Sequence, residues 1–326
     1  MPVHRRPGRR AGTEWRAVRR AARAEPRREP ARPPRAAYSR GGVYRHRRIY
    51  RRRARQRRPH AGSPQSLRRL GQHFLSDPKI LGRIADALDC VPGETIVEVG
   101  PGHGALTREL LARGVQVIAI EKDRALAEQL RFQVSGLRCQ VVTGDALELD
   151  WHELYSRHPT PDTRYRLKVV GNIPYYITSP LIDKALTPPL PERVVFLVQA
   201  EVAERLAAKP GGKTYGALSV GVQAVCRVEK LFTVEPGAFR PPPKVRSALV
   251  RLTPLARPLV NDVEVAPLRA FVTACFSRRR KQLKNAVPGM TEQDLRAAGF
   301  DPTLRPERLS PEAFVRLFRR SLTYQQ

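Results

Sequence analysis

The chain has 326 residues and a formal net charge of +30, because 60 Lys and Arg stand against 30 Asp and Glu. No apolar run is long enough to cross a membrane, which excludes an integral membrane protein, and the positive charge indicates a polyanionic partner. The four cysteines lack the spacing of a zinc site or of a secreted disulfide scaffold, so we expect no bound metal and a cytoplasmic location.

Residues 1–66 form an Arg-rich arm. Residues 1–70 contain 24 Arg, no Lys and three acids, a net charge of +21, among Pro, Ala and Gly. So few aliphatic side chains cannot offset the entropy lost on ordering, and we predict that the arm is disordered. We favour an incidental N-terminal extension, with a salt-sensitive RNA-binding tail or a targeting peptide as alternatives. We expect a chain without residues 1–66 to retain catalysis.

Residues 67–256 alternate short apolar runs with stretches of helical periodicity. This alternation predicts a Rossmann-like doubly wound α/β domain, whose sheet is mostly parallel and covered by helices on both faces. The expected helices include Ala105–Arg113 and Arg124–Phe132. The expected strands are Thr95–Val99, Gln116–Ile120, Cys139–Val142, Lys168–Val170, Arg193–Val198 and Ser247–Leu252. Ligands of such sheets bind at the carboxyl ends of the strands, so the residues that follow each run are the candidates for a site.

A glycine-rich turn follows the first of these strands. Gly100, Gly102 and Gly104 alternate with Pro101 and His103, and a helical stretch comes directly after them. Glycines permit a sharp turn and a close approach of the backbone to a ligand, and the helix start offers free N–H groups. The spacing differs from the GxGxxG of dinucleotide-binding proteins, so the turn alone indicates only a nucleotide-like ligand.

An acidic residue lies at or next to the carboxyl end of each of the first three strands. Glu98 precedes the glycines and is placed to meet a cationic amino group, while Glu121 is placed to accept from the two hydroxyls of a ribose. Asp145 is placed to accept from an adenine amino group. One such carboxylate is commonplace, but three in succession predict a pocket for S-adenosylmethionine, an adenosine with an amino-acid tail.

The fourth strand leads into Asn172-Ile-Pro-Tyr-Tyr176, which by itself is also a common strand-to-loop turn. An adenine amine is a poor nucleophile unless both its N–H groups are held by acceptors. The Asn172 side-chain oxygen and the Pro174 backbone carbonyl are candidate acceptors, and Tyr175 is a candidate to stack on a displaced base. No acid or base is needed before methyl transfer, since placing the amine in line with the methyl group is enough.

Together these motifs resemble the rRNA adenine N6-dimethyltransferases, most closely their small-subunit branch, over roughly Leu67 to Leu322. The motifs are Gly71–Leu75, Glu98–Gly104, Glu121, Asp145 and Asn172–Tyr175. The resemblance implies dimethylation of two adjacent adenosines in the 3′-terminal hairpin loop of small-subunit (16S-type) rRNA, within an immature 30S-type particle during ribosome assembly. It also implies that the cofactor pocket is lined by His73, Leu75, Gly100, Glu121, Asp145 and Asn172. Position 73 is Asn in many members of the family and His here.

Two further segments resemble the same family. Phe239–Ala248 places Arg240 and Lys244 beside the mouth of the site, although it also reads as a plain connector to an edge strand. Phe276–Asn285 carries Arg278, Lys281 and Lys284 at helical spacing, opposite Phe271, Cys275 and Leu283. We predict that residues 257–326 form a small helical RNA-binding domain, although such a basic face is ordinarily just solvated. It ends in a helix after Ser310 with Phe314, Leu317 and Phe318 buried.

Two other functions compete with this interpretation. One is the sister group that methylates large-subunit rRNA and confers macrolide resistance, which shares the Asn-Ile-Pro-Tyr turn. The other is a non-catalytic ribosome-assembly factor with the same fold, which has no reason to hold two acceptors against an amine. We expect a monomer that binds no membrane.

Overall fold

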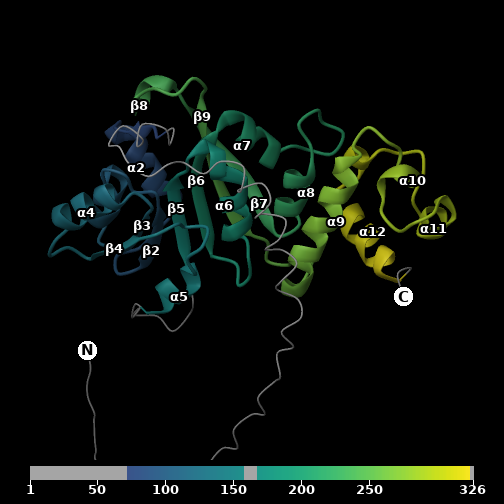
Figure 1. Ribbon diagram of the computed structural model, residues 1–326, viewed down its shortest axis with the longest axis horizontal. Helices are drawn as coiled ribbons and strands as arrows, with labels where there is room; N and C mark the ends of the chain where they lie inside the picture. The colour runs from purple at the N-terminus through teal and green to yellow at the C-terminus, as the bar shows by residue number, and fades with distance from the viewer. Residues whose placement is uncertain (1–71, 158–166, 324–326) are drawn as a thin grey trace, which may run out of the picture. The chain divides into compact units, whose positions relative to one another are not determined.

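The computed structural model describes residues 72–157 and 167–323, which belong to one compact unit. The predicted arm, residues 1–66, lies outside the described residues. Figure 1 shows the elements along the chain. Within the described residues, a seven-stranded sheet has the order β4-β3-β2-β5-β6-β9-β7. These strands are β2 (Thr95–Val99), β3 (Gln116–Glu121), β4 (Cys139–Thr143), β5 (Lys168–Asn172), β6 (Arg193–Gln199), β7 (Cys226–Val234) and β9 (Ser247–Pro254).

The five strands from β4 to β6 run parallel to one another, and β9 runs antiparallel to both β6 and β7. All five residues of β2 are buried, as expected for a central parallel strand covered on both faces. The six predicted strands are confirmed to within two residues at each end. Strand β7 was not predicted. The mostly parallel doubly wound sheet is therefore confirmed, with two antiparallel strands at one edge.

Helices cover both faces of the sheet. Alternate residues of β2 face opposite sides, so Ile96 packs in one apolar cluster and Val97 in the other. The first cluster contains side chains of α2 (Pro78–Ala87), α3 (Ala105–Ala112) and α4 (Arg124–Gln133). The second contains side chains of α5 (Trp151–Ser156), α6 (Thr178–Ala185), α7 (Ala200–Leu206) and α8 (Ala217–Gln223).

A short two-stranded ribbon joins two segments that are far apart in the sequence. Strand β1 (Phe74–Leu75) pairs antiparallel with β8 (Phe239–Arg240), so Phe74 lies opposite Arg240 and Leu75 opposite Phe239. Phe239 is fully buried and anchors the ribbon in the cluster that contains α2 and α3. The pairing brings the first motif of the family resemblance next to the Pro-rich segment.

The C-terminal helices extend the second cluster beyond the sheet. Val272, Phe314 and Leu317 belong to the same buried cluster as Val220 on α8. In Figure 1, α8 and α9 lie side by side. The elements are α9 (Val265–Ser277), α10 (Leu283–Ala286), α11 (Glu292–Ala297) and α12 (Pro311–Thr323). The prediction for the last helix is confirmed, because Ser310 Oγ accepts from Ala313 N–H and Phe314, Leu317 and Phe318 are all buried.

The predicted helical spacing of the basic segment is wrong. Helix α9 ends at Ser277, the chain turns through residues 278–282, and α10 begins at Leu283. Tertiary hydrogen bonds override the helical periodicity here. The Leu283 N–H donates to the Leu304 carbonyl at 2.7 Å, and the Arg278 guanidinium donates to the Asn285 carbonyl at 3.1 Å. The apolar side of the predicted pattern is buried nonetheless, through Phe271, Cys275 and Leu283.

Candidate active site

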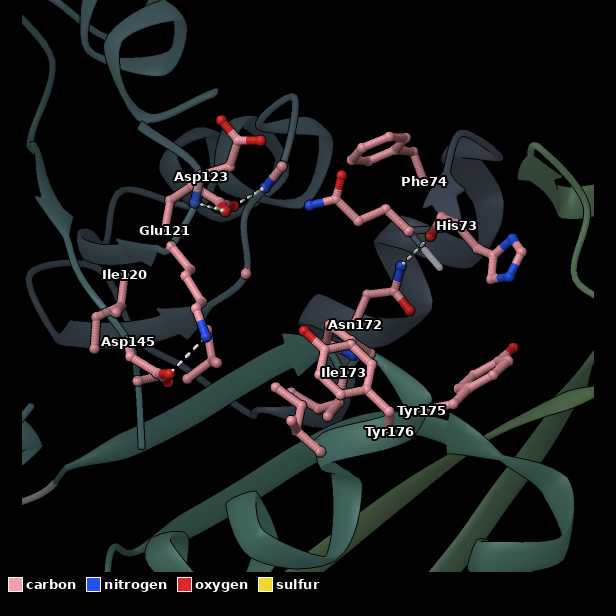
Figure 2. A pocket seen from close by; sticks show the side chains of 18 of the residues that line it. His73, Phe74, Ile120, Glu121, Asp123, Asp145, Asn172, Ile173, Tyr175 and Tyr176 are labelled. Carbon is pink, nitrogen blue, oxygen red and sulfur yellow. Dashed lines mark hydrogen bonds and ion pairs between the residues drawn. The ribbon is translucent and has the colours of Figure 1, made fainter. Parts of the chain in front are cut away.

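An open cavity lies at the carboxyl ends of β2, β3, β4 and β5 (Figure 2), and the empty space in it and in front of it is about 840 Å³. Each of these strands ends in one of the predicted motifs, so the parallel topology brings the motifs together. The candidate site residues among its lining are His73, Gly100, Gly102, Glu121, Asp145, Asn172, Pro174 and Tyr175. Lys122, Asp123, Ile173 and Tyr176 also line it.

The glycine turn forms one wall of the cavity. Gly100 and Gly102 have φ of +69° and +56°, a left-handed conformation that other residues rarely adopt. A Cβ at Gly102 would lie 2.8 Å from the Phe74 ring, so this position has no room for a side chain. The Gly102 N–H donates to Glu121 Oε2 at 3.0 Å. The turn therefore sets both the shape of the cavity and the position of the Glu121 carboxylate.

Glu121 is held by the backbone on both of its oxygens. Oε2 accepts from Gly102 N–H, and Oε1 accepts from Asp123 N–H at 2.9 Å. Burial raises the pKa of Glu121, while these backbone donors act to lower it. Each carboxylate oxygen has a second lone pair. A carboxylate fixed in this way can still accept from two adjacent hydroxyls, as the ribose interpretation requires. Asp123, by contrast, caps α4 by accepting from Ala125 N–H and Leu126 N–H.

Asp145 is paired with a neighbouring cation. Its Oδ2 lies 2.8 Å from Lys122 Nζ, and its Oδ1 accepts from Leu147 N–H at 3.0 Å. Burial acts to raise the pKa of Asp145, but the Lys122 ammonium and the Leu147 N–H together hold it below the ordinary value. The carboxylate is therefore charged at neutral pH.

Glu98 lines an adjoining open cavity, which shares Phe74, Gly100 and Asn172 with the first and is also lined by Leu75. Glu98 is 1% exposed and accepts from Thr107 Oγ1 at 2.6 Å. Burial raises its pKa to about 7, against the lowering effect of the Thr107 hydrogen bond. A buried carboxyl of this kind gains its charge when a cation approaches. The position suits the cationic amino group that the sequence predicts.

Asn172 ends β5 with its amide held in one orientation. Its Nδ2 donates to the His73 backbone carbonyl at 2.8 Å (Figure 2), and Oδ1 has no donor among the described residues. The His73 ring is engaged elsewhere, since Nδ1 lies 2.8 Å from the Pro241 carbonyl. The sequence could not show that position 73 acts on Asn172 through its backbone, because a backbone carbonyl is the same for every residue type.

The two tyrosines after Asn172 differ in their surroundings. Tyr175 is half-buried, its hydroxyl lies 2.8 Å from Ser247 Oγ, and its ring centroid is 5.8 Å from that of His73. Tyr176 is 58% exposed and has its ring on the other side of Asn172 in Figure 2. Because it is tethered at its hydroxyl, Tyr175 offers a fixed ring face. Tyr176 and Lys122 were not among the predicted site residues, although their positions directly after two predicted ones were a signal.

The carbonyl groups of the turn are not equally available. The Pro174 carbonyl accepts from Ile177 N–H at 3.1 Å and lies 3.4 Å from the Thr178 hydroxyl, within the short turn Tyr175–Ile177. Within the described residues, the Ile173 carbonyl has no hydrogen-bond donor. Ile173 lines the cavity, so its oxygen is the less encumbered acceptor beside Asn172.

The basic residues predicted to bind RNA are placed differently. Arg240 donates to the Gly237 and Phe239 carbonyls of its own turn and lines an open groove beside the site. Lys244 is exposed. Lys284 is paired with Glu292 at 3.1 Å, and the Arg278 guanidinium donates to the Asn285 carbonyl. Lys281 is exposed and, within the described part of the chain, its side chain has no polar partner.

The residues present fit S-adenosylmethionine. A glycine turn with no room for a side chain at Gly102, a carboxylate fixed for two hydroxyls and a buried carboxyl for a cation lie within one pair of adjoining cavities. No three His, Cys, Asp or Glu side chains gather into a possible metal site in residues 72–157 and 167–323. None of the helices in those residues is long and apolar enough to cross a membrane.

Comparisons with known proteins identify the family. Residues 65–321 match the family model of ribosomal RNA adenine dimethylases. The ribosomal RNA small subunit methyltransferase A of Pseudomonas aeruginosa is 46% identical over 254 residues, covering 77% of this chain and 92% of that protein. The corresponding protein of Hahella chejuensis is 43% identical over 256 residues, covering 78% of this chain and 92% of that protein.

Two solved structures share the fold. A dimethyladenosine transferase from Plasmodium falciparum has a TM-score of 0.65 and 26% identity, covering 78% of this chain and 98% of that one. The 23S rRNA methyltransferase ErmE has a TM-score of 0.56 and 32% identity, covering 76% of this chain and 98% of that one. The predicted methyltransferase fold is thereby confirmed, and the chain belongs to the ribosomal RNA adenine dimethylase family.

Proposed function

We propose that this chain is an S-adenosylmethionine-dependent enzyme that dimethylates the 6-amino groups of two adjacent adenosines in small-subunit rRNA. The observation that carries the proposal is the fixed amide of Asn172, whose Nδ2 is bound to the His73 carbonyl. Its free oxygen belongs to the same cavity as Glu121 and Asp145. An acceptor for an amine and a pocket for the methyl donor therefore occupy one site.

The chain's own residues hold the amine for attack. Asn172 Oδ1 accepts from one N–H of the target adenine, and a backbone carbonyl of the turn accepts from the other. Pro174 was the predicted carbonyl, but its oxygen already accepts from Ile177 N–H, so we favour Ile173 as the second acceptor. Two acceptors on one amino group localise the nitrogen lone pair and aim it. S-adenosylmethionine supplies an already activated methyl group, so these residues need only hold the amine in line.

The target base must leave its stack to reach Asn172. Tyr175 presents a ring face fixed by the Ser247 hydroxyl and by its neighbour His73, and stacking on it offsets part of the energy of unstacking. The cofactor contacts fall to Gly100, Gly102 and Glu121 around the ribose, to Asp145 at the adenine and to Glu98 at the amino-acid tail. His73 contributes its backbone carbonyl and Leu75 packs beside Glu98.

RNA contact beyond the target nucleotide is assigned to two regions. We propose that residues 67–256 hold the cofactor and that residues 257–326 bind RNA, together with Arg240 and Lys244 beside the cavity. Lys281 is exposed without a side-chain partner among the described residues, whereas Arg278 and Lys284 already have partners within the chain. Lys281 is therefore the strongest of the three candidates for a phosphate contact. We also propose that the substrate is an immature 30S-type particle, that the enzyme is a monomer and that it works in the cytoplasm.

Methylation of large-subunit rRNA is the second candidate, because the structure of the 23S rRNA methyltransferase ErmE shares the fold over 98% of its length. The relatives of higher identity are named as small-subunit enzymes, which favours the first candidate. A purely structural assembly factor is disfavoured by the intact Asn172 geometry.

Methyl incorporation on both substrates tests the proposal. Purified protein and radiolabelled S-adenosylmethionine are incubated with undermethylated small subunits and, separately, with unmethylated large-subunit rRNA. We expect label in two adjacent small-subunit adenosines and none in the large-subunit RNA. Label only in large-subunit RNA would overturn the substrate, and no label in either would overturn the enzymatic role. The Asn172→Ala variant is the matched control for contaminating activity.

A further inference from the structure

Lys122 lies where the adenine of the cofactor is expected to bind. It follows Glu121 directly at the end of β3, and its Nζ lies 2.8 Å from Asp145 Oδ2, an ion pair drawn as a dashed line at Asp145 in Figure 2. Among the described residues that line this cavity, it is the only Lys or Arg. Its side chain is 61% exposed, whereas that of Asp145 is 23% exposed.

This ion pair places a charged donor on one of the two Asp145 oxygens. Oδ1 already accepts from Leu147 N–H, and Oδ2 accepts from the ammonium. A hydrogen bond from a charged donor is stronger than one from a neutral amine, so an adenine amino group meets a carboxylate that already has a better partner. An exposed ion pair is weak, however, because water competes for both of its members. The Lys122–Asp145 ion pair can therefore be broken at a small cost in free energy.

We propose that Lys122 is a displaceable occupant of the adenine subsite, which holds Asp145 when no cofactor is bound and gives it up when the adenine amino group arrives. This inference rests on the proposed function. The ammonium, on a side chain that is already 61% exposed, then turns into water. Breaking the pair is part of every binding event, and remaking it assists every release.

The methyl donor and its demethylated product both have to displace Lys122 from Asp145, since both carry the same adenosine. Lys122 therefore does not select one over the other. Lys122 weakens the binding of both ligands and shortens the time that the product stays bound. Dimethylation of one amine uses two donor molecules in succession, so faster exchange of product for donor has a direct use in this reaction.

Calorimetric binding of S-adenosylmethionine and S-adenosylhomocysteine, without RNA, tests the inference on wild type, Lys122→Met and Lys122→Arg. We expect Lys122→Met to bind both ligands about two- to fivefold more tightly, which is the usual strength of an exposed ion pair. Their affinity ratio should stay the same, and Lys122→Arg should resemble wild type. Weaker or unchanged binding of both ligands by Lys122→Met would overturn the inference, because Lys122 would then support the cofactor or simply be solvated.

Salt dependence and a double variant supply readouts that a merely structural role would not change. S-adenosylhomocysteine lacks the sulfonium charge, so raising the salt concentration should tighten its binding to wild type by screening the ion pair, but not its binding to Lys122→Met. In an Asp145→Asn background, Lys122→Met should change nothing further. A retained effect in that background would contradict the proposed exchange.

The same measurements distinguish failure of the proposed function from failure of the role proposed for Lys122. If wild type binds neither ligand and incorporates no methyl group, the proposed function fails. If wild type binds both and methylates RNA while Lys122→Met binds them no more tightly, only the role of Lys122 fails. Release of bound radiolabelled S-adenosylhomocysteine into excess unlabelled ligand should also be slower from Lys122→Met by the same factor.

Discussion

The side-chain amide of Asn172 donates to the backbone carbonyl of His73, a residue 99 positions earlier in the chain. The bond decides which end of the amide faces the substrate, because it holds the NH₂ group and leaves the oxygen free. Strand β1 holds His73 in place through its pairing with β8, so the ribbon and the Pro-rich segment support the acceptor from behind. The orientation of the acceptor is therefore built into the fold before any ligand arrives.

Asn172→Ala should lower the rate of methyl transfer by roughly 100-fold or more, the usual effect of removing one well-placed polar group from an active site. The measurement is single-turnover methyl incorporation, with cofactor affinity followed by calorimetry. Cofactor binding should change only severalfold. If cofactor binding were lost altogether, Asn172 would serve the donor and not the target amine.

Asn172→Asp is the matched variant for the same bond. The ionised carboxylate of this variant has no donor for the His73 carbonyl, so we expect low activity at neutral pH. Protonation restores an O–H donor, and the rate relative to wild type should rise as the pH falls. A relative rate that is independent of pH would show that the hydrogen bond to His73 does not orient the acceptor.

Gly102→Ala should weaken cofactor binding about tenfold or more. Its Cβ would lie 2.8 Å from the Phe74 ring, and the strain would shift the N–H that holds Glu121. Gly136→Ala is the control, because Gly136 also has a positive φ, +78°, but has nothing within 4 Å of its Cβ position. Both variants should lose about 1 kcal/mol of stability from the backbone conformation. Only Gly102→Ala should change the calorimetric affinity for the cofactor. Equal changes in affinity in the two variants would contradict the role of the Gly102 turn in binding.

Glu98 should release a proton when the cofactor binds. Its pKa is about 7 in the free protein because of burial, and a nearby ammonium group favours the ionised form and lowers it. Below pH 7 the carboxyl is mostly protonated before binding, so binding should expel a proton. The binding enthalpy should then depend on the ionisation enthalpy of the buffer. In Glu98→Gln this dependence should fall sharply, and an unaltered dependence would place the cationic tail elsewhere.

The same pKa has a consequence for stability without cofactor. Because the folded-state pKa is raised from 4.5, the folded protein holds this proton more tightly than the unfolded chain does. The resulting stabilisation is fully present below pH 4.5 and is lost as the pH rises to about 7. Melting temperatures of Glu98→Gln and wild type should therefore diverge over this range in favour of the variant. A constant difference from about pH 4.5 to about pH 8 would contradict the shift.

The parallel strands were predictable because burial on both faces requires continuous apolar runs, as in β3 and β6. Strand β7 was missed because Arg227, Glu229 and Lys230 interrupt its apolar pattern. Strand β7 is stabilised by its pairing with β9, which includes the Arg251–Glu229 ion pair. A half-exposed antiparallel strand carries less of its own signal in the sequence than a buried parallel one does.

The site residues also divide into those that the sequence could predict and those that it could not. The positions of Glu121, Asp145 and Asn172 followed from the rule that ligands meet the carboxyl ends of parallel strands. The roles of the His73 carbonyl and of Lys122 depend on where distant segments come together. The place of Lys122 directly after Glu121 marked it as a neighbour of the site, but not its ion pair with Asp145. The end of α9 at Ser277 was unpredictable for a similar reason, since the carbonyl of Leu304 that receives the Leu283 N–H lies 21 residues further along the chain.

Lys281→Ala should weaken RNA binding more than Lys284→Ala does. The Lys281 side chain is exposed and free of partners among the described residues, so its full charge is available to a phosphate. Lys284 already shares its charge with Glu292, which lies 3.1 Å away and also accepts from Arg296. Affinity for the small-subunit hairpin should be measured over a range of salt concentrations. A lost phosphate contact lowers the slope of log affinity against log salt by about 0.7 to 0.9, with little effect on melting temperature.

Glu292→Ala is the complementary variant. It releases both Lys284 and Arg296, so RNA binding should become tighter and the salt slope steeper, and adding Lys284→Ala should remove the part of the gain that Lys284 supplies. If Lys281→Ala left both affinity and slope unchanged, Lys281 would not contact RNA. The same salt titration on Lys244→Ala would then test the candidate beside the cavity.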